Sequence, residues 1–251
     1  MMAVFLLLSF ALSWWSWWIP ALHLPVFAVG PLIAAVVVKG LRSPANARDL
    51  LRSSVQWRTG LEHYAVVFVI PVLLVVLSAT TAVALGAWLP SGASILSSSR
   101  LLLLFPVLLL VPGAGGAWSE PGWRGVALPW LLDRASPFAG TLCLGVIVAL
   151  WHLPLVVEGR QPFADLPWIV VWSFLFTWVF VRSGGNIFLA VLLHAWDDTL
   201  WNFCKSLFAD ADVVLLAWSH VGIYALASMV LVWATPYAWF TSRHKRLAER
   251  K

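Results

Sequence analysis

Ionisable side chains interrupt three otherwise apolar stretches of the sequence. Glu120 and Arg124 lie in AWSEPGWRGVALP, His152 lies in VALWHLP, and His194 lies in AVLLHAWDDTLW. A carboxylate or an imidazole can accept a proton from water, and a second set of donors can hold a developing oxyanion. If the three stretches meet, their residue types are sufficient to hydrolyse a substrate with an activated water.

The spacing within these stretches places charged partners on shared helix faces. Residues four apart lie one above the other on a helix, so His194 can meet Asp198. Glu120 can meet Arg124 in the same way if that segment is helical, and pairing lowers the cost of burying either charge. Asp197 points about 100° away from Asp198 on a helix, so we expect it to have a supporting role.

Each feature also has a purely structural explanation. A single histidine in a span is more often an interhelical hydrogen-bonding group, and this is our interpretation of His220. Glu120 and Arg124 could form a structural ion pair at the end of a span. His194 and Asp198 could form a buried packing contact. Three polar clusters in one apolar chain are harder to explain by coincidence than any single cluster.

Other intramembrane catalytic signatures are absent from the sequence. It contains no HExxH zinc-protease motif, no GxSxG serine elbow and no GxGD stretch of the kind found in intramembrane aspartyl proteases. Ser119 lies next to Glu120 without flanking glycines, so it is a poor candidate for a nucleophile.

The elements that must position these residues are apolar helices. Of the 251 residues, 61% are apolar and 11% are charged, and the mean hydropathy is +0.89. A soluble domain carries about 25% charged residues, and a disordered chain has low hydrophobicity, so both classes are excluded. Two cysteines, Cys143 and Cys204, cannot form a disulfide framework. We expect an all-α polytopic transmembrane helix bundle that forms a single membrane domain over residues 1–251.

Runs of about 20 apolar residues predict eight membrane spans. They cover residues 2–19, 22–38, 64–89, 101–118, 137–157, 167–181, 187–203 and 213–233. Pro25 and Pro31 predict a kink in the second span. The first stretch has no Lys or Arg before its apolar run, so we expect a retained helix rather than a signal peptide.

Basic residues gather on one side of this predicted topology. Of the 16 lysines and arginines, three fall on one side and the others on the opposite side. Because basic loops stay in the cytoplasm, we expect a multi-pass protein of the cell membrane with both termini cytoplasmic. Residues 39–62 would be a cytoplasmic loop that could form an interfacial helix, and residues 240–251 a basic cytoplasmic tail. The basic charge flanks the bilayer, so we expect lipid as a partner and no nucleic acid.

The three polar stretches, in this order, resemble the CAAX prenyl protease and bacteriocin-processing (CPBP, or Abi) family. The resemblance rests on SEPGWRGVALP, ALWHLP and TWVFVRSGGNIFLAVLLHAWDD, against family motifs EExxxR, FxxxH and HxxxN or HxxxD. It covers about residues 115–202, within a family-like core at about 100–204. It implies an intramembrane endopeptidase that hydrolyses a peptide or protein substrate at the membrane, such as a prenylated protein or a leader peptide.

The resemblance also assigns roles to five residues. Glu120 matches the second glutamate of the first motif, and Arg124 matches its arginine. His152 matches the second motif, and His194 and Asp198 match the third. In the family, the first glutamate and the second-motif histidine are described as activating a water, and the third-motif residues as holding the oxyanion. For this chain we therefore expect Glu120, with Ser119 adjacent, and His152 to activate a water, and His194 and Asp198 to stabilise transition-state charge. Arg124 would orient Glu120. The family has been described both with and without a metal, and His152, His194 and Asp198 could ligate a divalent metal such as zinc.

The sequence departs from the family pattern at two positions. Ser119 stands where the family has its first glutamate, and a serine cannot accept a proton without its own base. Either Glu120 takes over that role, or activity is weak, or the chain is a pseudoprotease that acts as a membrane scaffold or immunity protein. Val148 replaces an aromatic residue, which would alter packing more than chemistry. Asp198 is a permitted variant of asparagine, but an ionised aspartate cannot donate a hydrogen bond.

Straight membrane spans would keep Glu120 and His152 apart. His152 lies about 22 Å along the fifth span, out of reach of a Glu120 at the end of a straight fourth span. Several helix-breaking residues therefore predict a broken helix that returns into the membrane and places Glu120 beside His152 and His194: Gly113, Gly115, Gly116 and Pro121. A small transporter would also explain buried His and Asp, but it predicts repeat symmetry that the sequence lacks.

Overall fold

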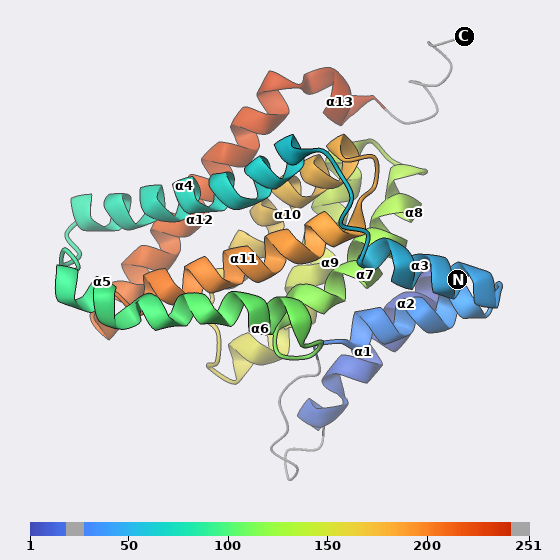
Figure 1. The fold of residues 1–251 in the computed structure, drawn as a ribbon, viewed down its shortest axis with the longest axis horizontal. Coiled ribbons are helices and arrows are strands. Elements are labelled where there is room, and N and C mark those ends of the chain that lie inside the picture. Colours follow the sequence, from blue (N-terminus) through green and yellow to red (C-terminus); the bar gives the residue numbers. More distant parts are fainter. Residues whose placement is uncertain (19–27, 242–251) are drawn as a thin grey trace.

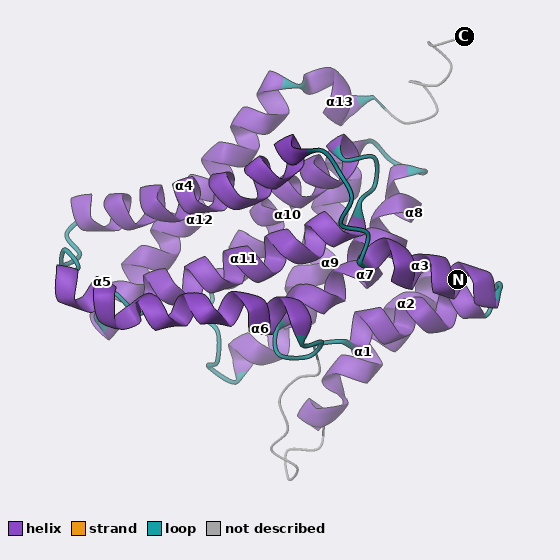
Figure 2. Cartoon of the chain, in the orientation of Figure 1, coloured by secondary structure: helices purple, strands orange, loops and turns teal. Residues whose placement is uncertain are grey.

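The computed structural model describes residues 1–18 and 28–241, and within them every regular element is a helix (Figures 1 and 2). The expected all-α polytopic bundle is confirmed. The start of the second predicted span, with Pro25, and residues 242–251 of the predicted basic tail lie outside the described residues.

The helices are α1 (Met2–Trp18), α2 (Gly30–Gly40), α3 (Pro44–Ser54), α4 (Leu61–Ala84), α5 (Gly92–Ser98), η2 (Ser99–Leu103), α6 (Leu104–Leu110), η3 (Gly116–Ser119), α7 (Glu120–Gly122), η4 (Trp123–Ala127), α8 (Leu128–Leu132), α9 (Pro137–Val157), α10 (Asp165–Arg182), α11 (Ile187–Lys205), α12 (Asp210–Ala234) and α13 (Pro236–Phe240).

Five helical segments in the described part of the chain are long and apolar enough to cross a membrane. They are Leu61–Ala84, Gly92–Leu110, Pro137–Val157, Asp165–Arg182 and Asp210–Ala234, and two shorter apolar helices are Met2–Trp15 and Gly30–Gly40. The chain is therefore a multi-pass membrane protein. The total of eight spans and the orientation of the termini stay predictions.

The fourth span differs from its predicted position. It begins at Gly92 and ends at Leu110, whereas residues 101–118 were expected. The helix ends where Val111 adopts an extended conformation before Pro112. Gly113 follows with a φ of +93°, which favours glycine. The chain then continues through the 3₁₀ turn η3, the single turn α7, the π-helical turn η4 and α8. The expected broken helix near the first motif is confirmed.

Helix α11 runs through the centre of the bundle. It packs against α4 on one side and against α6 and η2 on another, as Figure 1 shows. Asn186 begins the helix by accepting a hydrogen bond from the backbone N–H of Leu189 at 3.1 Å, and its side-chain amide donates to the carbonyl of Gln56. Every residue from Leu189 to Ala195 is buried, so the register of α11 is fixed by its packing.

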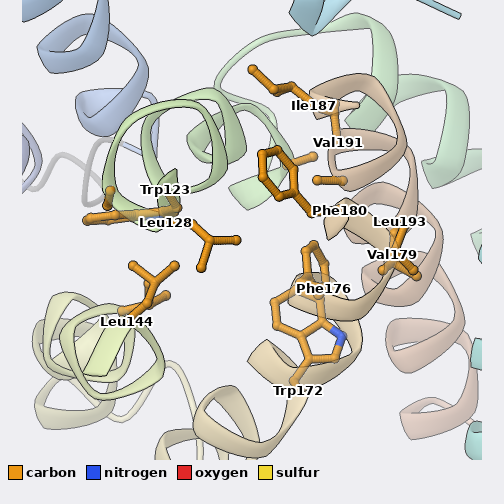
Figure 3. Packing of buried hydrophobic residues seen from close by; sticks show 14 of the residues in the cluster. Trp123, Leu128, Leu144, Trp172, Phe176, Val179, Phe180, Ile187, Val191 and Leu193 are labelled. Atoms are coloured by element: carbon orange, nitrogen blue, oxygen red, sulfur yellow. The ribbon is translucent and has the colours of Figure 1, made fainter. Parts of the chain in front are cut away.

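Aromatic and aliphatic side chains pack the broken segment against the long helices. Trp123 and Leu128, which follow the break, are fully buried and lie near Leu144 of α9 and Phe176 of α10 in Figure 3. Because lipid tails are as apolar as these side chains, the packing stabilises the bundle through close van der Waals contact. This packing holds a short, irregular backbone in the interior, where an unsupported loop could not persist.

Candidate active site

Glu120 lies at the helix break and is completely buried, with both carboxylate oxygens engaged. Oε2 lies 2.8 Å from Nη1 of Arg124, and Oε1 accepts a hydrogen bond from Nδ1 of His194 at 2.7 Å. The second contact joins residues 74 positions apart in the sequence. The structure thus brings the first and third predicted motifs together inside the protein.

Arg124 balances the charge of Glu120 in an apolar setting. Its side chain is 1% exposed, and its guanidinium carbon lies 4.4 Å from the centre of the Phe176 ring. The pair has the four-residue spacing that the sequence suggested, although the intervening backbone is partly π-helical. Because water is excluded from this pair, each charge depends on the other for its stability.

We expect Arg124→Met to lower the free energy of unfolding by about 3–5 kcal/mol, because it leaves the buried Glu120 carboxylate without a counter-ion. Arg134→Met is the matched control, since the exposed Arg134 stacks on Trp130 at 4.1 Å and its loss should cost less than about 1 kcal/mol. Denaturant titration of the detergent-solubilised protein would measure both values. Equal effects in the two variants would contradict a buried ion pair.

His194 is enclosed by aromatic rings and by backbone. Its ring is nearly perpendicular to that of Trp172, with centroids 4.8 Å apart, and Nε2 lies 3.4 Å from Oδ2 of Asp198. A methyl group on Gly116 would come within 2.6 Å of Nε2. Glycine at position 116 therefore allows the backbone of η3 to lie directly against the imidazole.

In the part of the chain that the structure describes, one ring nitrogen of His152, Nε2, has no hydrogen-bond partner. Nδ1 lies 2.9 Å from the carbonyl oxygen of Val148, which can only accept, so Nδ1 carries the proton. In the neutral ring Nε2 then has the free lone pair. The half-buried His152 lies within electrostatic range of His194, Asp198 and Glu120. The second predicted motif therefore lies beside the other two.

Two further predicted residues are buried at the edge of this cluster. Asp197 points away from Asp198, and the hydroxyl of Tyr224 on α12 donates to its Oδ1 at 2.5 Å. Sequence reasoning missed Tyr224, whose one signal is a phenol in an apolar span. Ser119 is 1% exposed and directly precedes Glu120, so no second carboxylate is present there.

His220 forms the interhelical contact that the sequence predicted. Its Nδ1 lies 3.0 Å from Oγ of Ser78 on α4, and its ring stacks on Trp201 at 4.4 Å. This contact joins α12 to α4, and the structural interpretation of His220 is confirmed.

The predicted zinc ligands do not form a metal-binding geometry. In residues 1–18 and 28–241, no group of three or more His, Cys, Asp or Glu side chains is placed to hold a metal ion. Both ring nitrogens of His194 face carboxylates, and Nδ1 of His152 faces a carbonyl. With both nitrogens of His194 facing carboxylates, Nε2 of His152 and Asp198 remain, which is fewer than the three protein ligands of a catalytic zinc site.

Comparison with known proteins shows a similarity over the segment that contains the predicted site. Residues 98–204 match the family model described as Rce1-like, type II CAAX prenyl endopeptidase. This match supports the expected resemblance to the CPBP family, and we call these residues the CPBP core. CAAX prenyl protease 2 of Methanococcus maripaludis is 26% identical over 150 residues, which are 53% of this chain and 54% of that protein. The chain thus spans about half the length of this curated relative.

The CPBP core contains all of the paired residues of the site. The segment from η2 to α11 supplies Glu120, Arg124, His152, His194 and Asp198. Helix α4 and helix α12, which contact α11 from outside the matched region, supply Ser78, Tyr224 and His220. The family resemblance expected from the three motifs is confirmed.

Proposed function

We propose that this chain is an intramembrane endopeptidase that hydrolyses peptide bonds of membrane-associated substrates with an activated water. The observation that carries the proposal is the buried Glu120–His194 contact of 2.7 Å, which lies beside the unpartnered Nε2 of His152 in a CPBP core. A scaffold does not need a proton acceptor at this position, whereas a hydrolase does.

We propose His152 as the general base and acid. Its Nε2 accepts a proton from water while the water oxygen attacks the carbonyl carbon of the substrate, and the carbonyl electron pair moves to oxygen. When the tetrahedral intermediate collapses, the carbon–nitrogen bond breaks and the leaving amine takes the proton from His152. The products are a carboxylic acid and an amine, and no other reactant is needed.

We propose that His194 stabilises the oxyanion. Its Nδ1–H donates to Glu120, and a proton on Nε2 could be donated to the substrate oxygen. The 3.4 Å separation of Nε2 from Asp198 is longer than a typical N–H···O hydrogen bond, so that contact can yield to the substrate. Asp198 would balance the charge of the ring rather than donate to the oxyanion.

The geometry supports a positioning role for Glu120 rather than the expected role in water activation. One of its oxygens faces His194 and the other faces Arg124, so the buried carboxylate is placed to orient these two side chains. Under this proposal Ser119 does not abolish activity, because His152 supplies the base. The printed name of the relative makes a prenylated peptide the first substrate class to test.

The natural sequence is expected to cleave a prenylated peptide in proteoliposomes, as measured by mass spectrometry of the products. Ser119→Glu tests the alternative of a pseudoprotease, because it restores the carboxylate that the family motif contains. Cleavage by the natural sequence supports the proposal. Cleavage by Ser119→Glu alone would show instead that the fold is intact and the natural protein is a pseudoprotease.

A further inference from the structure

A second polar pocket lies apart from the paired residues of the site. It has a volume of about 180 Å³ and lies between the α1–α2 hairpin and the stretch from Gly125 to Asp133. Lys39, Arg42 and Asp133 supply its charged side chains, Trp130 supplies an indole, and Val38 and Pro129 contribute apolar walls. We propose that this pocket binds the phosphodiester of an anionic membrane phospholipid.

The charges of the pocket favour an anion. Lys39 is partly buried in the last turn of α2, and Arg42 follows it on the surface. Within the described residues, neither cation forms an ion pair at 4.0 Å or less. Both cations can therefore attract the negative charge of a phosphate group.

The position of the pocket favours a lipid over a soluble anion. Lys39 follows the apolar helix from Gly30 to Val38, on which Ile33 and Val37 are exposed. Trp130 also lines the pocket, with the guanidinium of Arg134 stacked on it, and tryptophan and arginine are typical of the headgroup region. Apolar walls next to two cations fit a glycerol backbone and its phosphate together.

The pocket also touches the turn that supports the proposed active site. Gly125 and Val126 belong to the π-helical turn η4, which carries Arg124 on its buried side. A lipid in the pocket would therefore pack against the backbone that holds Arg124 beside Glu120. Lipid binding itself does not depend on whether the chain hydrolyses peptides, so it can be tested independently of the proposed function.

The experiment uses the full chain in detergent, titrated with phosphatidylglycerol and followed by native mass spectrometry. The double variant Lys39→Gln/Arg42→Gln should weaken phosphatidylglycerol binding by about tenfold or more, since each basic residue contributes to attraction of an anionic headgroup. The matched control is Arg48→Gln/Arg52→Gln, which removes the same charge from the exposed face of α3 and should leave binding within about twofold of the natural protein.

Phosphatidylcholine and inorganic phosphate distinguish the sources of the anion. In phosphatidylcholine the phosphate is neutralised by the ammonium group of the same headgroup, so weaker binding is expected. Inorganic phosphate at the same concentration should not displace phosphatidylglycerol. Equal weakening in both double variants would show diffuse surface attraction and overturn the proposal. Displacement by inorganic phosphate, or no saturable phosphatidylglycerol binding, would overturn it as well.

Discussion

His152→Ala should lower kcat for peptide hydrolysis by about 10²–10⁴-fold, which is the usual contribution of a positioned general base. The reason lies in its hydrogen bonding. The Val148 carbonyl holds the proton on Nδ1, which leaves Nε2 as the proton acceptor of the site. KM should change little, because the proposed role of His152 is confined to the chemical step.

The same variant should leave the fold intact. The one hydrogen bond of the His152 ring is to a carbonyl of its own helix, and the side chain is only partly buried. His63→Ala is the matched control, because His63 lies outside the CPBP core and contacts the carbonyl of Arg182 at 3.3 Å. Added imidazole should partly restore turnover in His152→Ala and have no effect on His63→Ala. Full activity of His152→Ala in a monodisperse sample would refute a base at this position.

Local rules of sequence were enough to predict the charged partners of the site. Four-residue spacing predicted that Glu120 pairs with Arg124 and that His194 lies near Asp198, and both pairs occur, at 2.8 Å and 3.4 Å. The high cost of a charge in an apolar span predicted that distant clusters would converge. The Glu120–His194 contact agrees with that expectation.

Three features of the site depend on contacts between distant residues and could not be predicted from the sequence. The path of the chain after the fourth span depends on a positive φ at Gly113 and on the packing of Trp123 and Leu128, and hydropathy alone reports neither. The role proposed for Glu120 differs from the one expected from the sequence because its two oxygens face two different partners, one of which lies in another helix. Tyr224 escaped prediction because its partner Asp197 lies 27 residues away, on α11.

Gly116→Ala should lower kcat for peptide hydrolysis, because Gly116 lies directly against His194. Gly116→Ala would place a methyl group 2.6 Å from Nε2, well inside van der Waals contact. The ring has little room to move, because Glu120 holds Nδ1 at 2.7 Å and Trp172 packs against its face. Either η3 or the imidazole must shift. A displacement of about 1 Å at a reacting group can lower the rate by about 10²-fold, so kcat should fall by that order.

Gly222→Ala is the matched control for this substitution. Gly222 is a helical residue of α12, and a methyl group there would meet no atom within 4 Å. Alanine is the better helix former by about 1 kcal/mol, so the control should be as stable as the natural protein or more stable, and fully active. Activity assays and unfolding titrations of the two variants separate the effects. If Gly116→Ala kept its activity, contact with the backbone of η3 would not hold His194 in position. The proposed arrangement of the site around His194 would then be wrong.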